Sequence, residues 1–312
     1  MSEPIKFPKL RPLQPHPVNY QGQPGLLLRD PQGYCQKEVF IPLQISQILG
    51  LFDGTHSLLD IQAEYMRRFG EFLYSEKLEE LIEELDEGLF LESERFRTQR
   101  ARLEEEFRHS PVRRPALAGR SYPDEPERLS ELLDGLFSEP GGPGLPEPSA
   151  SHDSIRGVVA PHIDLQRGGL TFARAYKELA EGSEAEIFIV LGTAHAPTKS
   201  PFIVTGKDFE TPLGLLKTDL EVVERLERAC GSGLFEEEFV HKAEHSIELQ
   251  ALFIAHLFAR RRAVRFVPIL CGSFQEFILD GKLPVESPEV AAFTRALKEA
   301  LKLLARGDVV AL

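Results

Sequence analysis

The chain has 312 residues, and its 49 acidic and 36 basic side chains give a net charge of −13. The acidic excess is spread along the sequence, which argues against nucleic acid as a partner, since nucleic-acid binding needs a basic face or stripe. No apolar run approaches the roughly 18 residues of a membrane span, so we expect no membrane association. Three cysteines cannot form a disulfide framework, and the N-terminus lacks the pattern of a signal peptide, which together favour a cytoplasmic protein.

Residues 1–92 predict a small N-terminal domain of helical, winged-helix-like character. Its first 35 residues are rich in Pro, Gly and Gln, which indicates an extended lead-in. Two helices are expected next, capped by Ser57 and Ser75, with Gly88 ending the second. Their buried stripes are predicted to be Leu58, Ile61 and Tyr65 in the first helix and Leu78, Leu81, Ile82 and Leu85 in the second. The apolar LFLES that follows is expected to form a short strand.

The role of this domain is left open by its sequence. The segment DGTHSLLDIQAEYMRRFG is similar to PqqD-like peptide-binding domains. A small helical domain of unassigned role explains the same pattern equally well. Residues 93–112 are highly charged and lack a strong apolar stripe, so we expect an exposed linker helix there.

Residues 113–312 predict a larger α/β domain, apparently truncated at its C-terminus. After a Pro- and Gly-rich loop at 139–151, short β-branched runs alternate with helical stretches. The expected strands are 156–160, 186–192, 201–206 and 264–270, and the expected helices lie near 169–180, 219–230, 246–259 and 288–305. Because the strands are apolar throughout, we predict a mainly parallel sheet with helices on both faces. The final DVVAL has the pattern of another buried strand, and we therefore expect a fragment of a longer protein.

Two histidines follow expected strands of this domain. His162 comes after GVVAP in the turn APHIDL, and His195 comes after IFIVLG in the turn GTAHAP. Sites in open α/β sheets gather beyond the carboxyl ends of the strands, so both side chains could point into one crevice if the strands are neighbours. Imidazoles there could converge on a metal ion or a substrate. Spacing alone favours the alternative, in which the two histidines are structural or incidental.

The segment HKAEHSIELQ at 241–250 provides further candidates. His241 and His245 are four residues apart, as are Glu244 and Glu248, so on a helix each pair would share one face. HKAEH also fits the H-x-x-E-H signature of zinc peptidases, with Glu244 as the general base. Such peptidases need another carboxylate ligand from a later helix, and none is obvious in the remaining sequence. A zinc protease is therefore the minor alternative.

Other catalytic signatures are missing from the sequence, including the phosphate-binding loop, the G-x-S-x-G elbow and the dinucleotide-binding G-x-G-x-x-G. Cys271 follows VPIL at the expected mouth of the sheet, but a small buried hydrophobic residue is the favoured interpretation. Cys35 and Cys230 give no signal.

Six blocks occur in this order in the second domain: ALAGRSYPDEPERLSELLDGLF, GVVAPHIDLQRGG, IFIVLGTAHAP, FETPLG, EHSIELQ and FVPILCGS. In this order they resemble the blocks of Memo family proteins, whose bacterial members are often called AmmeMemoRadiSam system protein B. The resemblance extends from Ala116 to Leu312, whereas the N-terminal domain lies outside it.

The resemblance implies a fold shared with class III extradiol dioxygenases, whose non-haem iron is held by two histidines and a carboxylate. Memo proteins keep the two histidines and use a cysteine as the third ligand. By resemblance, His162 and His195 are the ligands of iron or copper, with zinc as a further candidate. His245, from the E-H-S block and next to Glu244, lines the pocket and would position a substrate or transfer a proton. The family's ligand cysteine lies beyond the last residue of this sequence, and Cys271 belongs to a different block and does not replace it.

Two function classes stay open on this basis. In the first, the domain is an enzyme with redox or oxygen-dependent, dioxygenase-like activity on a small molecule. In the second, it is a non-enzymatic adaptor whose pocket binds an acidic or phosphorylated peptide. The N-terminal domain would then recruit a partner, and partner proteins of the AmmeMemoRadiSam system are the candidates that the resemblance suggests.

Overall fold

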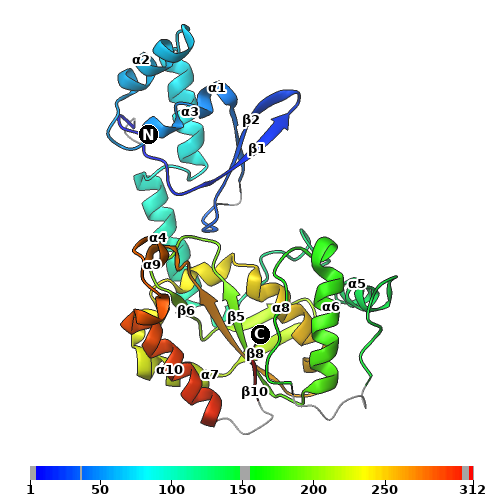
Figure 1. The fold of residues 1–312 in the computed structure, drawn as a ribbon. Coiled ribbons are helices and arrows are strands. Elements are labelled where there is room, and N and C mark those ends of the chain that lie inside the picture. Colours follow the sequence, from blue (N-terminus) through cyan, green and yellow to red (C-terminus); the bar gives the residue numbers. More distant parts are fainter. Residues whose placement is uncertain (1–4, 36, 148–154, 304–308, 312) are drawn as a thin grey trace. The chain divides into compact units, whose positions relative to one another are not determined.

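The protein is described by a computed structural model that covers residues 5–35, 37–147, 155–303 and 309–311. The chain divides into two compact units, Met1–Glu106 and Phe107–Leu312. Both are drawn in Figure 1. No helix in the described ranges combines the length and the apolar character that crossing a bilayer requires.

The first unit begins with an antiparallel three-stranded sheet in the order β1 (Gln14–Tyr20), β2 (Gln23–Arg29) and β3 (Val39–Pro42). Gln21 and Gly22 both have positive φ angles, 52° and 84°, as a tight hairpin turn requires. The extended lead-in predicted for the first 35 residues is therefore wrong. Prolines are tolerated in β1 because it is an edge strand, where a missing N–H costs no ladder hydrogen bond.

Helices follow this sheet. They are α1 (Leu43–Ser46), the 3₁₀ turn η1 (Leu49–Leu51), α2 (Leu58–Phe69), α3 (Ser75–Glu87) and α4 (Glu94–His109). Ser57 caps α2 as predicted, and its side chain and that of Asp60 form a capping box. The N-cap of α3 is Tyr74, one residue before the predicted Ser75, and Gly88 is its C-cap. The expected stripes reach the core of the unit through Ile61, Tyr65, Leu78, Ile82 and Leu85, which are all buried.

The strand expected at LFLES does not form. Leu89 has a φ of 62°, which interrupts an extended conformation. Leu91 makes only an isolated bridge to Leu10, although it and Phe90 are buried in the core of the unit.

The second unit contains a seven-stranded sheet. Its order is β10–β5–β9–β8–β7–β4, and β6 pairs with β9 beyond the end of β8. The strands are β4 (Val112–Arg113), β5 (Ile187–Thr193), β6 (Phe202–Val204), β7 (Asp208–Thr211), β8 (Gly214–Thr218), β9 (Arg265–Cys271) and β10 (Val309–Ala311). β5 runs parallel to both β9 and β10, and among the strands that the structure describes in this sheet the antiparallel pairs are β7–β8 and β6–β9.

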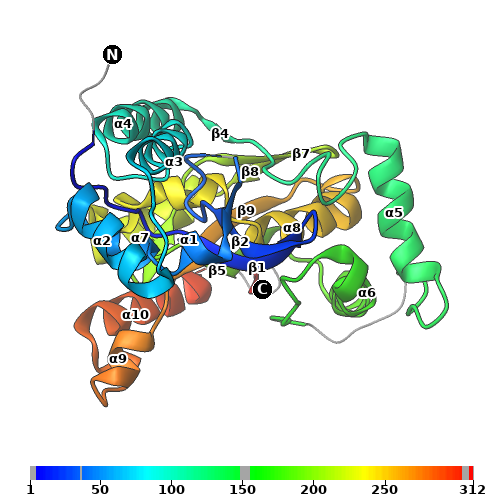
Figure 2. The same cartoon turned by 90° about the horizontal axis from the view of Figure 1, so that it is seen from above.

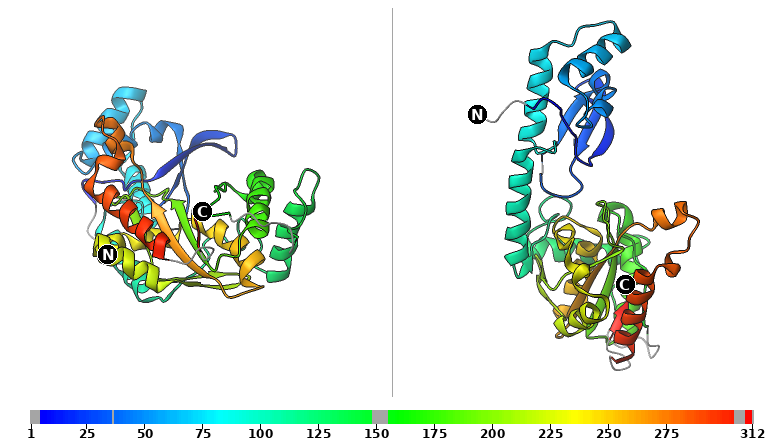
Figure 3. Two further views of the ribbon diagram at one scale, coloured as in Figure 1. Left: turned by 60° about the horizontal axis from the view of Figure 1, so that its bottom comes forward. Right: turned by 90° about the vertical axis from the view of Figure 1, so that its left-hand side faces the viewer.

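Helices cover both faces of this sheet, as the sequence predicts. One face carries α5 (Pro126–Ser138), α6 (Leu165–Gly182) and α8 (Ser246–Ile254), and the other carries α7 (Leu220–Cys230) and α10 (Pro288–Leu303) (Figures 1 and 2). Figure 3 shows α10 beside α7. The remaining elements are η2 (Ser232–Phe235), η3 (Glu238–Lys242), the π-helix η4 (Ala255–Ala259), α9 (Gln275–Leu279) and η5 (Pro284–Glu286).

β5 shows how the sheet separates two cores. Phe188 and Val190 pack with the residues of α5, α6 and α8, whereas Ile187 and Ile189 pack with those of α7 and α10. Residues 156–160 do not add the strand that was expected there. Gly157 makes a single β-bridge and Val159 is 94% exposed, so the run forms no continuous strand before α6.

Candidate functional site

Three histidine rings meet beyond the carboxyl end of β5. The ring centroids of His195 and His245 are 4.5 Å apart, those of His162 and His195 are 5.1 Å apart, and those of His162 and His245 are 6.4 Å apart. His195 follows β5, His245 immediately precedes α8, and His162 lies shortly before α6. The structure thus brings together both histidines that follow predicted strands and the histidine of the E-H-S block.

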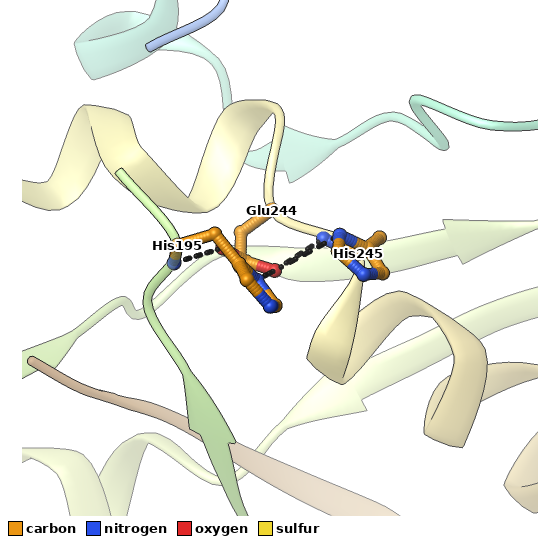
Figure 4. Close-up of side chains that lie close together, drawn as sticks. All are labelled: His195, Glu244 and His245. Atoms are coloured by element: carbon orange, nitrogen blue, oxygen red, sulfur yellow. Dashed lines mark hydrogen bonds and ion pairs between the residues drawn. The ribbon is translucent and has the colours of Figure 1, made fainter. Parts of the chain in front are cut away.

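Glu244 joins two of these histidines, as Figure 4 shows. Its Oε1 lies 2.9 Å from Nδ1 of His195 and 3.3 Å from Nδ1 of His245. Its Oε2 accepts a hydrogen bond of 2.8 Å from the backbone N–H of His195. The side chain of Glu244 is only 4% exposed, while those of His195 and His245 are 37% and 35% exposed. A buried carboxylate therefore supports two imidazoles that reach the surface.

The charges of this group follow from its contacts. Burial acts to raise the pKa of Glu244, but the hydrogen bonds from His195 and from backbone N–H groups outweigh it and hold the pKa at about 2. The same bond to Glu244 raises the pKa of His195. Burial lowers the pKa of His245, although Glu244 opposes that effect. The carboxylate is thus ionised at neutral pH, and the pKa values of the two histidines beside it are shifted in opposite directions.

The helix α8 anchors the turns that carry the other two histidines. Ser246 Oγ donates to the carbonyl of Thr193, two residues before His195, at 2.8 Å. One turn later, Gln250 Nε2 donates to the carbonyl of Pro161, next to His162, at 2.9 Å. Ser246 and Gln250 are four residues apart, so they share one side of the helix. They also line a small cavity of about 40 Å³ that His162 borders.

A buried ion pair lies behind the site. Arg113 and Glu248 are 0% and 1% exposed, and their side chains are in contact. Arg113 also donates to the carbonyls of His241 and Glu244, at 2.9 and 2.8 Å. Glu248 accepts hydrogen bonds from the hydroxyl of Tyr122 and from the backbone N–H groups of Ala116 and Leu117. This network fixes the turn that leads into α8.

The segment HKAEH is not one continuous helix. His241 belongs to the 3₁₀ helix η3, which ends at Lys242, and α8 starts only at Ser246. His241 is buried, with its Nε2 3.1 Å from the carbonyl of Ile203. Among the described residues, the group whose ligand atoms lie within 4.8 Å of one another is His195, Glu244 and His245, and neither His241 nor His162 belongs to it. The helical pairing of His241 with His245 is therefore wrong, and with it the geometry on which the zinc-protease interpretation depended.

Cys271 lies at the carboxyl end of β9 but belongs to the opposite core. It packs with the cluster of α7 and α10, which includes Phe202 and Ile269. Burial raises the pKa of its thiol to about 11, so it is not a thiolate at neutral pH.

Sequence reasoning missed the residues that hold the site together, namely Arg113, Ser246 and Gln250. Ser246 and Gln250 stand in the EHSIELQ block at helical spacing, which is a signal that could have identified them. Arg113 has no comparable local signal.

The fold and this geometry define an α/β protein with a histidine cluster beyond the end of a parallel strand and a buried carboxylate behind it. Residues 113–279 match the family model described as Memo-like protein. This chain belongs to the Memo family, as the sequence blocks predicted.

Several relatives carry the same family name. A MEMO1 family protein of Aquifex aeolicus is 30% identical over 238 residues, which cover 76% of this chain and 61% of that protein. One from Methanopyrus kandleri is 37% identical over 159 residues, covering 50% of this chain and 55% of the relative. One from Pyrococcus furiosus is 34% identical over 202 residues, covering 64% and 62%. The matched segments thus span between 55% and 62% of these relatives.

Proposed function

We propose that the histidine cluster of the second unit binds iron or copper through His162 and His195. The observation that carries this proposal is the convergence of three imidazoles beside a buried, ionised carboxylate. Imidazole nitrogens suit iron, copper and zinc, and the partial exposure of the rings leaves space for a further ligand. Two imidazoles would leave the other coordination positions to water, to a substrate or to another protein ligand.

The residues around the cluster have separate roles in this proposal. His162 and His195 hold the metal, which when bound would supply one-electron redox chemistry. His245 positions a small substrate or accepts its proton, because burial favours the neutral form of this ring. The buried carboxylate of Glu244 compensates positive charge in the pocket. The free thiols of Cys35, Cys230 and Cys271 fit a reducing compartment, and we place the activity in the cytoplasm.

Metal content per chain tests the proposal. Protein purified without added metal is reconstituted anaerobically with ferrous iron, copper or zinc and analysed by elemental mass spectrometry. We expect about one iron or copper ion per chain, lost in His162→Ala and in His195→Ala. The exposed His56, in the first unit, provides the control variant His56→Ala, which should retain the metal.

Loss of metal in His162→Ala and His195→Ala is informative only if both variants are folded. Both cluster histidines lie in turns outside the apolar cores, so circular dichroism should show a wild-type spectrum for each variant. Metal content that is independent of both histidines would contradict the proposal. A second result would also contradict it: the wild-type protein retains no metal, and both it and the variant that combines His162→Ala with His195→Ala bind an acidic or phosphorylated peptide. That result would indicate an adaptor module.

A further inference from the structure

Glu244 looks like a third metal ligand by distance alone, but hydrogen bonds already occupy its carboxylate. Oε1 accepts from Nδ1 of His195 at 2.9 Å, and from the backbone N–H groups of His245 and Ser246 at 2.8 and 2.9 Å. Oε2 accepts from the backbone N–H of His195 at 2.8 Å. Each carboxylate oxygen has two lone pairs, so the three donors to Oε1 fill that oxygen, whereas Oε2 accepts one bond and keeps one position open. Coordination of a metal through Oε1 would have to displace a bond that shapes the site.

The bond to His195 determines which nitrogen of that ring is free. An ionised carboxylate can only accept, so Nδ1 of His195 must carry the hydrogen that points at Oε1. The lone pair of a neutral ring is then on Nε2, which points away from Glu244. A metal ligand needs that lone pair, and its position is set by the bond that the other nitrogen makes.

A second layer holds Glu244 itself. Arg113 donates to the main-chain carbonyls of His241 and Glu244, at either end of the turn that carries the carboxylate. The guanidinium is held in turn by Glu248, which is anchored to the chain at Ala116 and Leu117. Because all of these side chains are buried, the turn has little freedom to move the carboxylate away from His195.

We propose that Glu244 is a positioning residue: it fixes His195 with Nδ1 protonated and Nε2 free on the side of the ring away from Glu244, and Arg113 and Glu248 hold Glu244 in place. This inference rests on the proposed function in one respect, namely that a metal ion binds to the free Nε2. The hydrogen-bonded arrangement itself belongs to the metal-free protein and is testable there.

The test is the tautomer of His195, measured by long-range ¹H–¹⁵N NMR on metal-free protein labelled with ¹⁵N-histidine. The His195→Ala spectrum assigns the signal. In the wild-type protein, at a pH where the ring is neutral, we expect the proton on Nδ1. In Glu244→Met we expect the Nε2-protonated form to appear, because the side chain no longer offers an acceptor to Nδ1. Glu236→Gln removes a charge from an exposed glutamate on the same stretch of chain and should leave the tautomer unchanged.

A second variant and a metal titration keep the outcomes distinct. If Glu244→Met does not fold, Glu244→Asp keeps the charge but shortens the side chain, so the bond to Nδ1 should be lost and the Nε2-protonated form should again appear. Affinity for ferrous iron should fall by about 10- to 100-fold in the folded variant, as for other partners of metal-bound histidines. A wild-type tautomer in a folded Glu244 variant would overturn the inference, and complete loss of iron with that tautomer unchanged would identify Glu244 as a ligand instead. If the tautomer responds but wild-type protein binds no metal, the positioning role stands and the proposed function fails.

Discussion

The two faces of the seven-stranded sheet are covered by helices of different character. All nine residues of α8 are buried, and they include the polar Ser246, Glu248 and Gln250. The buried residues of α7, on the other face, are Val222, Val223 and Leu226. Burying a polar group is unfavourable unless it is hydrogen-bonded, and each polar side chain of α8 has a partner. The helices α7 and α10 pack against the sheet through apolar side chains. The helix α8 packs against it as well, and its polar side chains also position the turns that carry the histidines.

The largest effect should come from breaking the buried ion pair behind α8. Arg113→Met leaves Glu248 charged and unpaired in the core, and we expect the free energy of unfolding to fall by about 3–5 kcal/mol. Urea denaturation followed by circular dichroism measures this. On the other face, the pair of Arg225 with Glu221 is exposed, so Arg225→Met should change stability by no more than about 0.5 kcal/mol. An equal decrease in the free energy of unfolding in both variants would contradict the distinction between the two faces.

The next effect is a pH dependence of the free energy of unfolding, which arises from the buried His241 on the α8 face. Burial lowers its pKa from 6.5 to about 3, so above pH 6.5 the ring is neutral in both the folded and the unfolded states. Below pH 6.5 the unfolded state takes up a proton that the folded state does not, so stability is lost as the pH falls. The expected slope from this residue is up to about 1.4 kcal/mol per pH unit.

Urea denaturation of metal-free protein between pH 7 and about 5 detects this slope before most carboxylates titrate. His241→Gln keeps a donor for the carbonyl of Ile203 but does not titrate, so its stability should depend less on pH. Identical slopes for wild-type protein and this variant would show that His241 is not held neutral.

An effect of similar size should follow from releasing the turn that carries His162. Gln250→Met keeps the volume but removes the donor to Pro161 and the acceptor for Tyr176, at a cost of about 1–3 kcal/mol. Iron affinity should fall as well, because His162 loses its anchor. Tyr176→Phe removes only the bond between the tyrosine and Gln250, so it should lower stability but leave iron affinity near wild type. Iron binding that is reduced equally in both variants would contradict a specific role for the bond to Pro161.

The smallest effect is expected on the α7 and α10 face. Cys271→Ala removes a sulfur from an apolar cluster, which should lower the free energy of unfolding by about 1 kcal/mol. Metal content after reconstitution should stay at the wild-type level, in contrast to His195→Ala. A loss of metal in Cys271→Ala would mean that the two faces are coupled in a way their packing does not indicate.

Local patterns predicted much of the second unit. Apolar runs predicted β5 and β9, and helical periodicity predicted α6 and α7. The positions just after expected strands indicated His162 and His195 as candidate site residues. One of those strands, at 156–160, does not form, and the turn of His162 is instead anchored by the hydrogen bond from Gln250 to the carbonyl of Pro161. The hairpin of β7 and β8 was missed because its sequence, DFETPLGLLKT, lacks a continuous β-branched run.

The supporting network could not be predicted, because its contacts join distant parts of the chain. Arg113 meets the carbonyl of Glu244 across 131 residues of sequence, and no spacing rule links such positions. In isolation, an arginine beside another arginine in PVRRP reads as a surface residue. Only the folded sheet, with β4 at its edge, places this side chain beneath α8.

The central claim is that the α8 face presents His162 and His195 to one metal ion, and X-ray absorption at the iron edge tests it most directly. Iron-loaded protein should show nitrogen ligands with the outer-shell scattering of two imidazoles, and His162→Ala and His195→Ala should each lose part of that scattering. A spectrum without imidazole scattering, or one that is the same in both variants as in the wild-type protein, would contradict the account.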